Sequence, residues 1–159
     1  MSIDIRAATP ADVPDMLRFV RELAAFEKAG PDDVPVNAAR LNDALFGPHA
    51  VAEALIAEWD GEAAAFALFF HNFSTWQGLK GLYLEDLYVS EAMRGHGIGS
   101  ALLKRLAGIA VERGCVRFEW VVLDWNEGAI RVYERIGAKM QHAWRIMRME
   151  GEALKGFAA

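Results

Sequence analysis

Cysteine is nearly absent from this chain of 159 residues, so no disulfide can form within it. The one thiol, Cys115, follows Gly114 at the start of an apolar stretch. This position favours a buried structural cysteine over a nucleophile, and the lack of a second cysteine fits a reducing compartment. The 4 histidines are scattered along the chain without the close spacing of metal ligands. We therefore predict a protein without a metal site.

Long apolar runs and an excess of basic residues are absent as well. The stretch A-A-A-F-A-L-F-F, residues 63–70, is too short to span a membrane and is typical of a strand. The first residues, M-S-I-D-I-R, contain no basic region ahead of an apolar core, so we expect no secretory signal and a cytoplasmic location. The formal net charge of −5 argues against nucleic acids and anionic membranes as partners. A hydrophobic content of 53% is ordinary for a soluble protein, and the length fits one domain over residues 1–159.

The most informative part of the sequence is L-Y-L-E-D-L-Y-V-S-E-A-M-R-G-H-G-I-G-S-A-L-L, residues 82–103. An apolar strand that carries Glu85 and Asp86 leads into a short polar loop, and an apolar-periodic helix follows. The loop contains Arg94 and then glycines at every second position, namely Gly95, Gly97 and Gly99. Glycines at a helix N-terminus let backbone N–H groups approach a phosphate closely, and the helix dipole favours its negative charge. The segment is therefore predicted to bind an anion next to carboxylates.

Several phosphate-binding loops share parts of this pattern. The nucleotide-binding loop that ends in Gly-Lys-Ser/Thr is excluded, because Gly99 is followed by Ser100 without a lysine. A dinucleotide-binding G-x-G-x-x-G loop lacks only its last glycine, and Glu119 lies about 20 residues further on, but residues 90–94 separate this loop from its strand. The third pattern, R-x-x-G-x-G, resembles the pyrophosphate loop of the GNAT N-acetyltransferase superfamily. A flexible helix start without any ligand is the remaining interpretation.

The order of the predicted elements narrows the fold class to α/β (α+β). Three consecutive strands before the glycine loop give a mixed central β-sheet flanked by helices on both faces, which fits an acetyltransferase better than a Rossmann domain. The predicted strands are residues 3–7, 50–58, 63–70, 82–89 and 116–123, with a turn at Asp60-Gly61, a loop over residues 71–81, and one more strand or bent pair over residues 139–149. The predicted helices are a first one from the Thr9 cap to about residue 26, then residues 37–45, 100–113 and 127–136.

Several further segments make the resemblance closer: the chain is similar to the diamine (spermidine/spermine) and thialysine N-acetyltransferase group. The similar segments run from the first helix to the last and keep their order; they are Arg21–Lys28, Phe73–Trp76, Leu82–Val89, Arg94–Ser100, Leu123–Asn126, Tyr133 and Gly137-Ala138. Ser74 stands where the polyamine-specific members carry an acid, and Phe26 replaces a tyrosine. The turn before Trp144 also lacks their acids. These departures argue against a polyamine specificity, and Ser74 and the segment Leu123–Asn126 are closer to the thialysine-acetylating branch.

The resemblance implies a GNAT fold, acetyl-CoA as co-substrate without a metal, and a small-molecule primary amine as acceptor. Glu85 would accept the proton of the ammonium, directly or through water, and Tyr133 would protonate the departing sulfur. The N–H of Leu87 would polarise the thioester carbonyl, while Val89 pairs with the pantetheine arm. The residues implied to contact the cofactor are Leu87, Tyr88, Val89, Arg94, Gly95, His96, Gly97, Ile98, Gly99, Ser100, Asn126 and Tyr133. Those implied to contact the amine are Phe26, Glu27, Trp76, Glu85, Asp86, Glu119 and Trp144.

Each of these residues also has a plain structural interpretation. Because side chains alternate along a strand, Glu85 and Asp86 are expected to point to opposite faces. The structural interpretation is that one of them is simply a solvated acid. Tyr133 fits a packed helix face, and Asn126 fits a helix N-cap. A non-catalytic acyl-CoA-binding sensor on the same fold is therefore the alternative function. The resemblance further implies a homodimer, with the apolar residues of Trp144–Met149 at its interface.

Overall fold

The computed structural model describes residues 2–159, which form two compact units, one ending at residue 121 and one spanning residues 122–159. In the first unit the elements are β1 (Ile3–Ala7), α1 (Val13–Phe26), α2 (Ala38–Phe46), β2 (Glu53–Trp59), β3 (Glu62–Ser74), β4 (Leu79–Val89), α3 (Ile98–Glu112) and β5 (Phe118–Glu119). Short 3-10 turns lie at Pro10–Asp12, Pro31–Asp33 and Glu91–Met93. The second unit contains α4 (Glu127–Arg135) and α5 (Gly151–Ala158).

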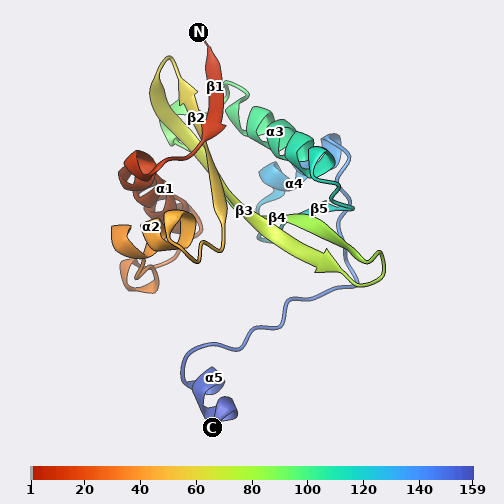
Figure 1. Cartoon of the computed structure of the whole chain (residues 1–159). Helices are drawn as coiled ribbons and strands as arrows, with labels where there is room; N and C mark the ends of the chain where they lie inside the picture. Colours follow the sequence, from red (N-terminus) through yellow and green to blue (C-terminus); the bar gives the residue numbers. More distant parts are fainter. Residues whose placement is uncertain (1) are drawn as a thin grey trace. The chain divides into compact units, whose positions relative to one another are not determined.

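The first unit is built on a mixed sheet in the order β1-β2-β3-β4-β5, in which only the β4–β5 pair is parallel. Helices α1 and α2 lie on one face and α3 on the other, as Figure 1 shows. Met16 and Phe19 of α1 pack with Ile56 and Phe66 of the sheet in the core on the α1 side. The predicted mixed sheet with helices on both faces is confirmed.

The start of α1 is fixed to the sheet by charged side chains. The backbone N–H of Thr9 donates to Asp12 Oδ2 at 2.7 Å, as expected for the predicted cap. Both terminal nitrogens of Arg6 donate to Asp12 at 2.8 Å, and Nη2 also donates to Glu58 at 2.6 Å. The Arg6 hydrogen bonds lower the pKa of Asp12 to about 2. The helix is therefore anchored at its first turn to β1 and β2.

The hairpin of β3 and β4 is longer than the sequence indicated. The loop predicted over residues 71–81 is wrong, because β3 continues to Ser74 and β4 begins at Leu79, with Phe73 opposite Lys80. Polar side chains do not interrupt antiparallel pairing when the backbone groups of the two strands satisfy each other. The strand predicted over residues 116–123 is too long, since only Phe118–Glu119 pairs with β4.

The second unit contains a short capped helix and an extended segment. Asn126 Oδ1 accepts a hydrogen bond from the N–H of Ala129 at 3.2 Å, so the predicted cap of α4 is confirmed. The strand predicted over residues 139–149 is wrong: no strand is assigned within that range, and α5 follows it unpredicted. Alternating apolar residues indicated an extended backbone, but a strand also needs an edge to pair with.

Candidate active site

A bulge in β4 interrupts the regular alternation of side chains at the two acids of the predicted site. Leu68 of β3 lies opposite Asp86, but the next residue, Phe69, lies opposite Leu84, so Glu85 is the extra residue. Because Leu68 and Phe69 point to opposite faces, Leu84 and Asp86 do so too, and Glu85 cannot alternate with both of its neighbours. The expectation that Glu85 and Asp86 point to opposite faces rested on regular alternation and stays a prediction. Regular alternation fails at a bulge.

Asp86 lies on the face of the sheet that α1 covers. Leu68, the residue opposite Asp86, packs against the core cluster of α1 and α2. Glu27 directly follows the last residue of α1, and its charge reaches Asp86. The structure thus brings together three of the predicted amine-binding residues, Glu27, Glu85 and Asp86.

Asp86 is the acid that this environment changes most. Burial raises its pKa to about 6, with smaller contributions from the charges of Glu85 and Glu27. Burial also raises the pKa of Glu27. The side chain of Glu85, in contrast, is exposed. A half-buried carboxylate beside further negative charges is held at a cost that a bound cation would offset.

The same part of β4 has a free edge within the first unit. On one side β4 pairs with β3 along nearly its whole length, from Leu79 to Val89. On the other side it pairs with β5 only at Leu82 and Tyr83. Among the strands that the structure describes, none pairs with the β5-facing edge of residues 84–89. This edge gives an extended ligand backbone groups to bond with.

The glycine loop begins where this edge ends. Gly95 and Gly97 have φ values of 84° and 78°, in the left-handed region that favours glycine. A Cβ atom added to either would meet nothing within 4 Å, so the space above the loop is open. The first helical hydrogen bond of α3 runs from Ala101 N–H to the Gly97 carbonyl at 3.0 Å. The N–H groups of residues 98–100 precede it and suit an anion.

Two side chains of the loop contact rings outside it. The guanidinium carbon of Arg94 lies 5.1 Å from the ring centre of Phe26 and 5.5 Å from that of Tyr88, and its Nε donates to the Val89 carbonyl at 3.2 Å. The ring of His96 lies 4.7 Å from that of Trp59, and its Nδ1 lies 3.2 Å from the Met93 carbonyl oxygen.

The contact of Trp59 with the loop could not be predicted from the sequence, because Trp59 is the last residue of β2 and belongs to no recognisable motif. Hairpin geometry brings it there. Leu87 and Val89 lie on the opposite face of β4 from Tyr88, 3.8 Å and 3.6 Å from a Cβ added at Gly99. The first turn of α3 therefore rests on the end of β4.

Two predicted amine-binding residues of the first unit lie elsewhere. Glu119 accepts hydrogen bonds from Asn72 Nδ2 at 2.6 Å and pairs with Arg117 Nε at 3.1 Å, so its charge is compensated. Trp76 lies in the turn between β3 and β4, and 89% of its surface is exposed. Within residues 2–159, neither Glu119 nor Trp76 has a hydrogen bond or ion pair with Glu27, Glu85 or Asp86.

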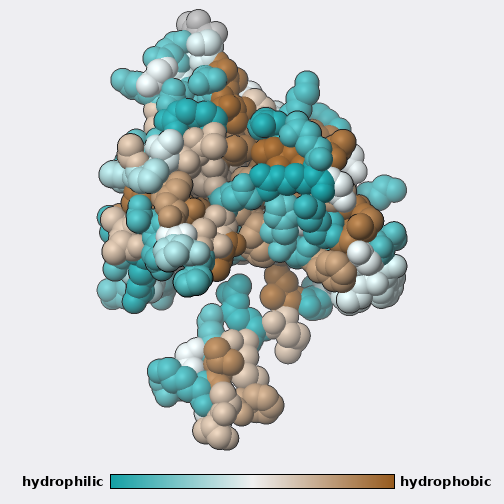
Figure 2. All heavy atoms as spheres, viewed as in Figure 1, coloured by the Kyte–Doolittle hydropathy of each residue, from teal (hydrophilic) through white to brown (hydrophobic). Residues whose placement is uncertain are grey.

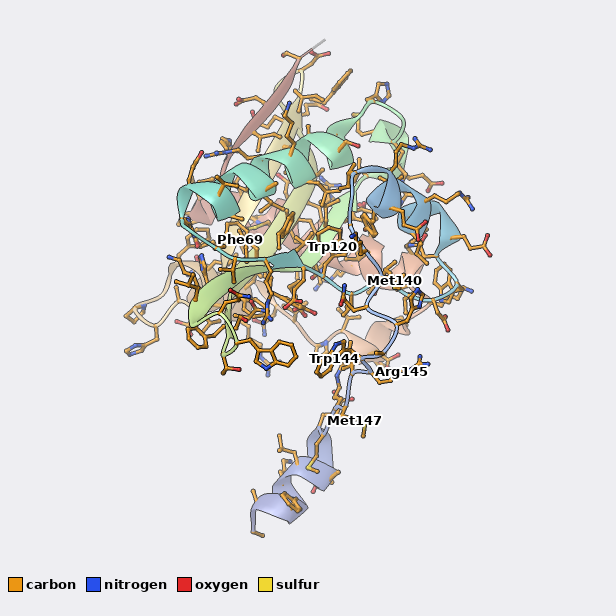
Figure 3. The ribbon with its side chains drawn as sticks, turned by 90° about the vertical axis from the view of Figure 1, so that its right-hand side faces the viewer. Phe69, Trp120, Met140, Trp144, Arg145 and Met147 are labelled. Atoms are coloured by element: carbon orange, nitrogen blue, oxygen red, sulfur yellow. The ribbon has the colours of Figure 1, made fainter. Side chains whose placement is uncertain are left out.

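The remaining predicted residues belong to the second unit. Asn126 caps α4, and Tyr133 lies on that helix with its side chain half-buried. Trp144 projects from the extended segment together with Met147, as Figure 3 shows, and 72% of its surface is exposed. Asn126, Tyr133 and Trp144 are therefore all part of the second unit, residues 122–159.

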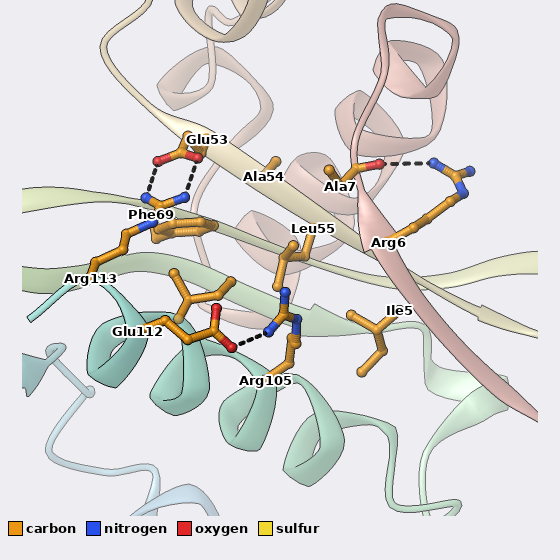
Figure 4. A pocket seen from close by; sticks show the side chains of 11 residues that line it. Ile5, Arg6, Ala7, Glu53, Ala54, Leu55, Phe69, Arg105, Glu112 and Arg113 are labelled. Carbon is orange, nitrogen blue, oxygen red and sulfur yellow. Dashed lines mark hydrogen bonds and ion pairs between the residues drawn. The ribbon is translucent and has the colours of Figure 1, made fainter.

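A cavity of about 330 Å3 lies between α3 and the strands β1, β2 and β3. None of the predicted site residues lines it. Figure 4 shows that its charges are paired: Arg113 bonds to Glu53 at 2.6 and 2.9 Å, and Arg105 bonds to Glu112 at 3.3 Å. Because these acids compensate the arginines, we assign no ligand to this cavity.

Membrane-spanning helices and metal-binding clusters are two further features by which a chain can be classified. None of the helices between residues 2 and 159 has the length and apolar character that crossing a bilayer requires. Over the same residues, no three His, Cys, Asp or Glu side chains are grouped so that they would hold a metal ion.

Comparison with known proteins identifies relatives of the whole chain. Residues 17–138 match the model of the acetyltransferase (GNAT) family. The chain is 37% identical to a thialysine N-epsilon-acetyltransferase of Sus scrofa, with 99% of this chain and 98% of that protein covered. It is 35% identical to a spermidine/spermine N(1)-acetyltransferase-like protein of Homo sapiens, covering 97% of this chain but 23% of that protein. An integron cassette protein of V. cholerae has a similar structure, with a TM-score of 0.81, 27% identity, and coverage of 99% and 98%.

Proposed function

Because the chain belongs to the GNAT acetyltransferase family, we propose that it transfers acetyl from acetyl-CoA to a primary amine of thialysine, a lysine-like amino acid or a short diamine. The carrying observation is the half-buried Asp86, which lies beside the β4 bulge at Glu85 and within reach of the Glu27 charge, next to a free strand edge and a glycine loop. The similarity to the thialysine N-epsilon-acetyltransferase of Sus scrofa covers 99% of this chain and 98% of that protein, which supports this choice of acceptor.

The glycine loop and the β4 edge fit the proposed cofactor. The open space over Gly95 and Gly97, with the N–H groups of the first turn of α3 below it, suits the pyrophosphate of coenzyme A. Arg94 adds positive charge, and the edge of Leu87–Val89 suits the pantetheine arm. When bound, acetyl-CoA supplies the acetyl group as a thioester. Asn126 is proposed to add a contact from the second unit.

The acids supply the proton chemistry on the amine side. An alkylammonium has a pKa near 10 and must lose a proton before it attacks. We assign Glu85 as the acceptor of that proton, directly or through water, since Glu85 is exposed to solvent. Asp86, with a pKa of about 6, is ionised at neutral pH and provides the counter-charge that binds the ammonium. Glu27 adds further negative charge from the end of α1.

Tyr133 is proposed to donate a proton to the departing sulfur. A phenol carries a proton that it can donate to a departing thiolate, as a general acid must. The residue lies on α4, whose first turn Asn126 fixes. Phe26, Trp76 and Trp144 are proposed as apolar walls for the methylene chain of the amine, and Glu119 as a more distant acid.

The test is a comparison of amines by thiol release at saturating acetyl-CoA. We expect kcat/KM for thialysine, lysine or a short diamine to exceed that for spermine, because Ser74 and the turn before Trp144 lack acids for further ammonium groups. Binding of acetyl-CoA in calorimetry, without any thiol release across the amines, would instead indicate an acyl-CoA sensor. A preference for spermine would contradict the proposed acceptor.

We also propose a cytoplasmic homodimer. In the segment after α4, Trp144, Ile146 and Met147 expose 72%, 65% and 91% of their surfaces, and a second copy would bury part of this apolar area. Figure 2 shows hydrophobic residues along the same segment. Light scattering should give twice 17.6 kDa, about 35 kDa, at micromolar concentration. A mass of one chain would contradict the dimer.

A further inference from the structure

The side chain of Arg94 links the glycine loop to the end of α1. Its guanidinium lies over the rings of Phe26, the last residue of α1, and Tyr88 of β4. Both distances are within the range of cation–π attraction. One arginine of the proposed phosphate site therefore contacts the helix of the proposed amine site.

Backbone hydrogen bonds tie Glu27 to the end of α1. The N–H of Glu27 donates to the Leu23 carbonyl at 2.9 Å, and the N–H of Ala29 donates to the Ala24 carbonyl at 2.9 Å. Between them Lys28 has a φ of 66°, in the left-handed region that a residue other than glycine enters only at a cost. These bonds close the helix directly after Phe26. Displacing the Phe26 ring would thus also displace the Glu27 carboxylate beside Asp86.

A second, weaker link lies one turn earlier on α1. Ser90, which follows β4, has its hydroxyl 3.5 Å from Glu22 Oε2 and 3.3 Å from Arg18 Nη1. These long contacts hold the middle of the helix near the segment before the loop. The contact of Arg94 with Phe26 is the one that reaches the end of the helix, where Glu27 lies.

The geometry of a guanidinium allows Arg94 to serve both sites at once. Its N–H groups lie in the plane of the group and point outward, while its faces stack on rings. Nε is used by the Val89 carbonyl. A phosphate oxygen that bonds the outer edge can fix the group without removing it from the Phe26 ring. Fixing Arg94 then fixes the helix end.

We propose that Phe26 is a positioning residue that, through Arg94, couples the occupancy of the glycine loop to the placement of Glu27 in the amine site. This inference rests on the proposed function. Coenzyme A bound at the loop should increase the affinity for the amine, and by thermodynamic reciprocity the amine should increase the affinity for coenzyme A. For an exposed cation–π pair, the part of this coupling that Phe26 carries should be about 2- to 5-fold.

The experiment compares Phe26→Leu, which removes the ring, with Phe26→Tyr, which keeps it. Calorimetry gives the Kd of thialysine with and without saturating coenzyme A, and thiol release gives kcat and KM. In Phe26→Leu the gain in thialysine affinity on adding coenzyme A should fall by about 2- to 5-fold, whereas the loss of the ring as an apolar wall lowers the affinity equally with and without coenzyme A. Phe26→Tyr should keep the coupling of the wild type. Circular dichroism checks the fold of each variant.

Arg94→Lys completes a double-variant cycle. Alone it should reduce the coupling as Phe26→Leu does, and the double variant should lose no more, because either change breaks the same contact. The single Arg94→Lys variant also carries the test if Phe26→Leu does not fold. Unchanged coupling in these variants, or equal losses in Phe26→Leu and Phe26→Tyr, would overturn the inference. A wild-type protein that acetylates no amine would instead contradict the proposed function.

Discussion

The two compact units differ most in what they bury. The unit up to residue 121 has a core in which Phe19, Phe66 and Leu102 are fully enclosed, whereas between residues 122 and 159 no side chain is classed as buried. The first unit fixes the acids of β4 and the glycine loop on rigid elements. The second carries Tyr133, Asn126 and Trp144 on short elements with apolar groups that remain exposed. Among residues 2–159, the fully buried apolar side chains thus all belong to the first unit.

This contrast suggests that the second unit depends on contacts outside itself for its stability. Burying a large apolar side chain contributes roughly 1.5–3 kcal/mol, and Trp144, Met147 and Phe157 gain little of this at exposures of 72%, 91% and 81%. Variants of the proposed acids, in the first unit, should act on the amine, whereas variants of the proposed phenol, in the second unit, should act on turnover.

The largest effect is expected in the second unit. Tyr133→Phe removes one hydroxyl and keeps the ring, so turnover should fall on the order of 100- to 10,000-fold, while the Kd of acetyl-CoA stays nearly constant. Stopped-flow thiol release and calorimetry measure the two quantities. Turnover close to that of the wild type would assign Tyr133 to packing and restrict the chemistry to the first unit.

A smaller but clear effect is expected at the glycine loop. Gly97→Val should weaken coenzyme A binding by more than about tenfold, because a side chain at this left-handed position both strains the loop and fills the space proposed for the pyrophosphate. Gly114→Val is the matched control. Gly114 lies at the other end of α3 with a φ of 69° and no atom within 4 Å of an added Cβ.

The control separates strain from binding. Both glycine variants should lose stability, measured by thermal unfolding, since both force valine into the left-handed region. Only Gly97→Val should lose affinity in calorimetry. Equal affinities for the two variants would remove the loop from the proposed cofactor site.

The sequence predicted local structure well and long-range register poorly. The caps at Thr9 and Asn126, the span of α3 and the mixed sheet follow from short-range patterns of polar and apolar residues, and the structure has them. The bulge at Glu85 depends on how β3 pairs with β4, which no local pattern contains. For the same reason the contacts of Arg94 with Phe26 and of His96 with Trp59 were not foreseen. The predicted strand at residues 139–149 failed because alternation does not specify a partner.

An effect on stability rather than on activity is expected from the burial of the Asp86 carboxylate in the first unit. Its pKa of about 6 lies above the ordinary 3.8, so the folded chain holds this proton more tightly than the unfolded chain. The free energy of unfolding therefore falls as the pH rises from about 4 to 6, by at most about 3 kcal/mol, and stays lower at pH 7.5. Asp86→Asn should raise the Tm at pH 7.5 and leave it nearly unchanged at pH 4. Equal changes at both pH values would contradict the assigned cause.

The most direct test of the account is the pH dependence of kcat/KM for thialysine in the wild type, Glu85→Gln and Asp86→Asn. We predict that the wild-type value falls as the pH drops through about 6, where Asp86 gains its proton, and that Asp86→Asn loses this step. Glu85→Gln should be slow at neutral pH and partly recover at high pH, where more of the amine is already neutral. Wild-type values at every pH in both variants would contradict a site built on the two acids of the bulge.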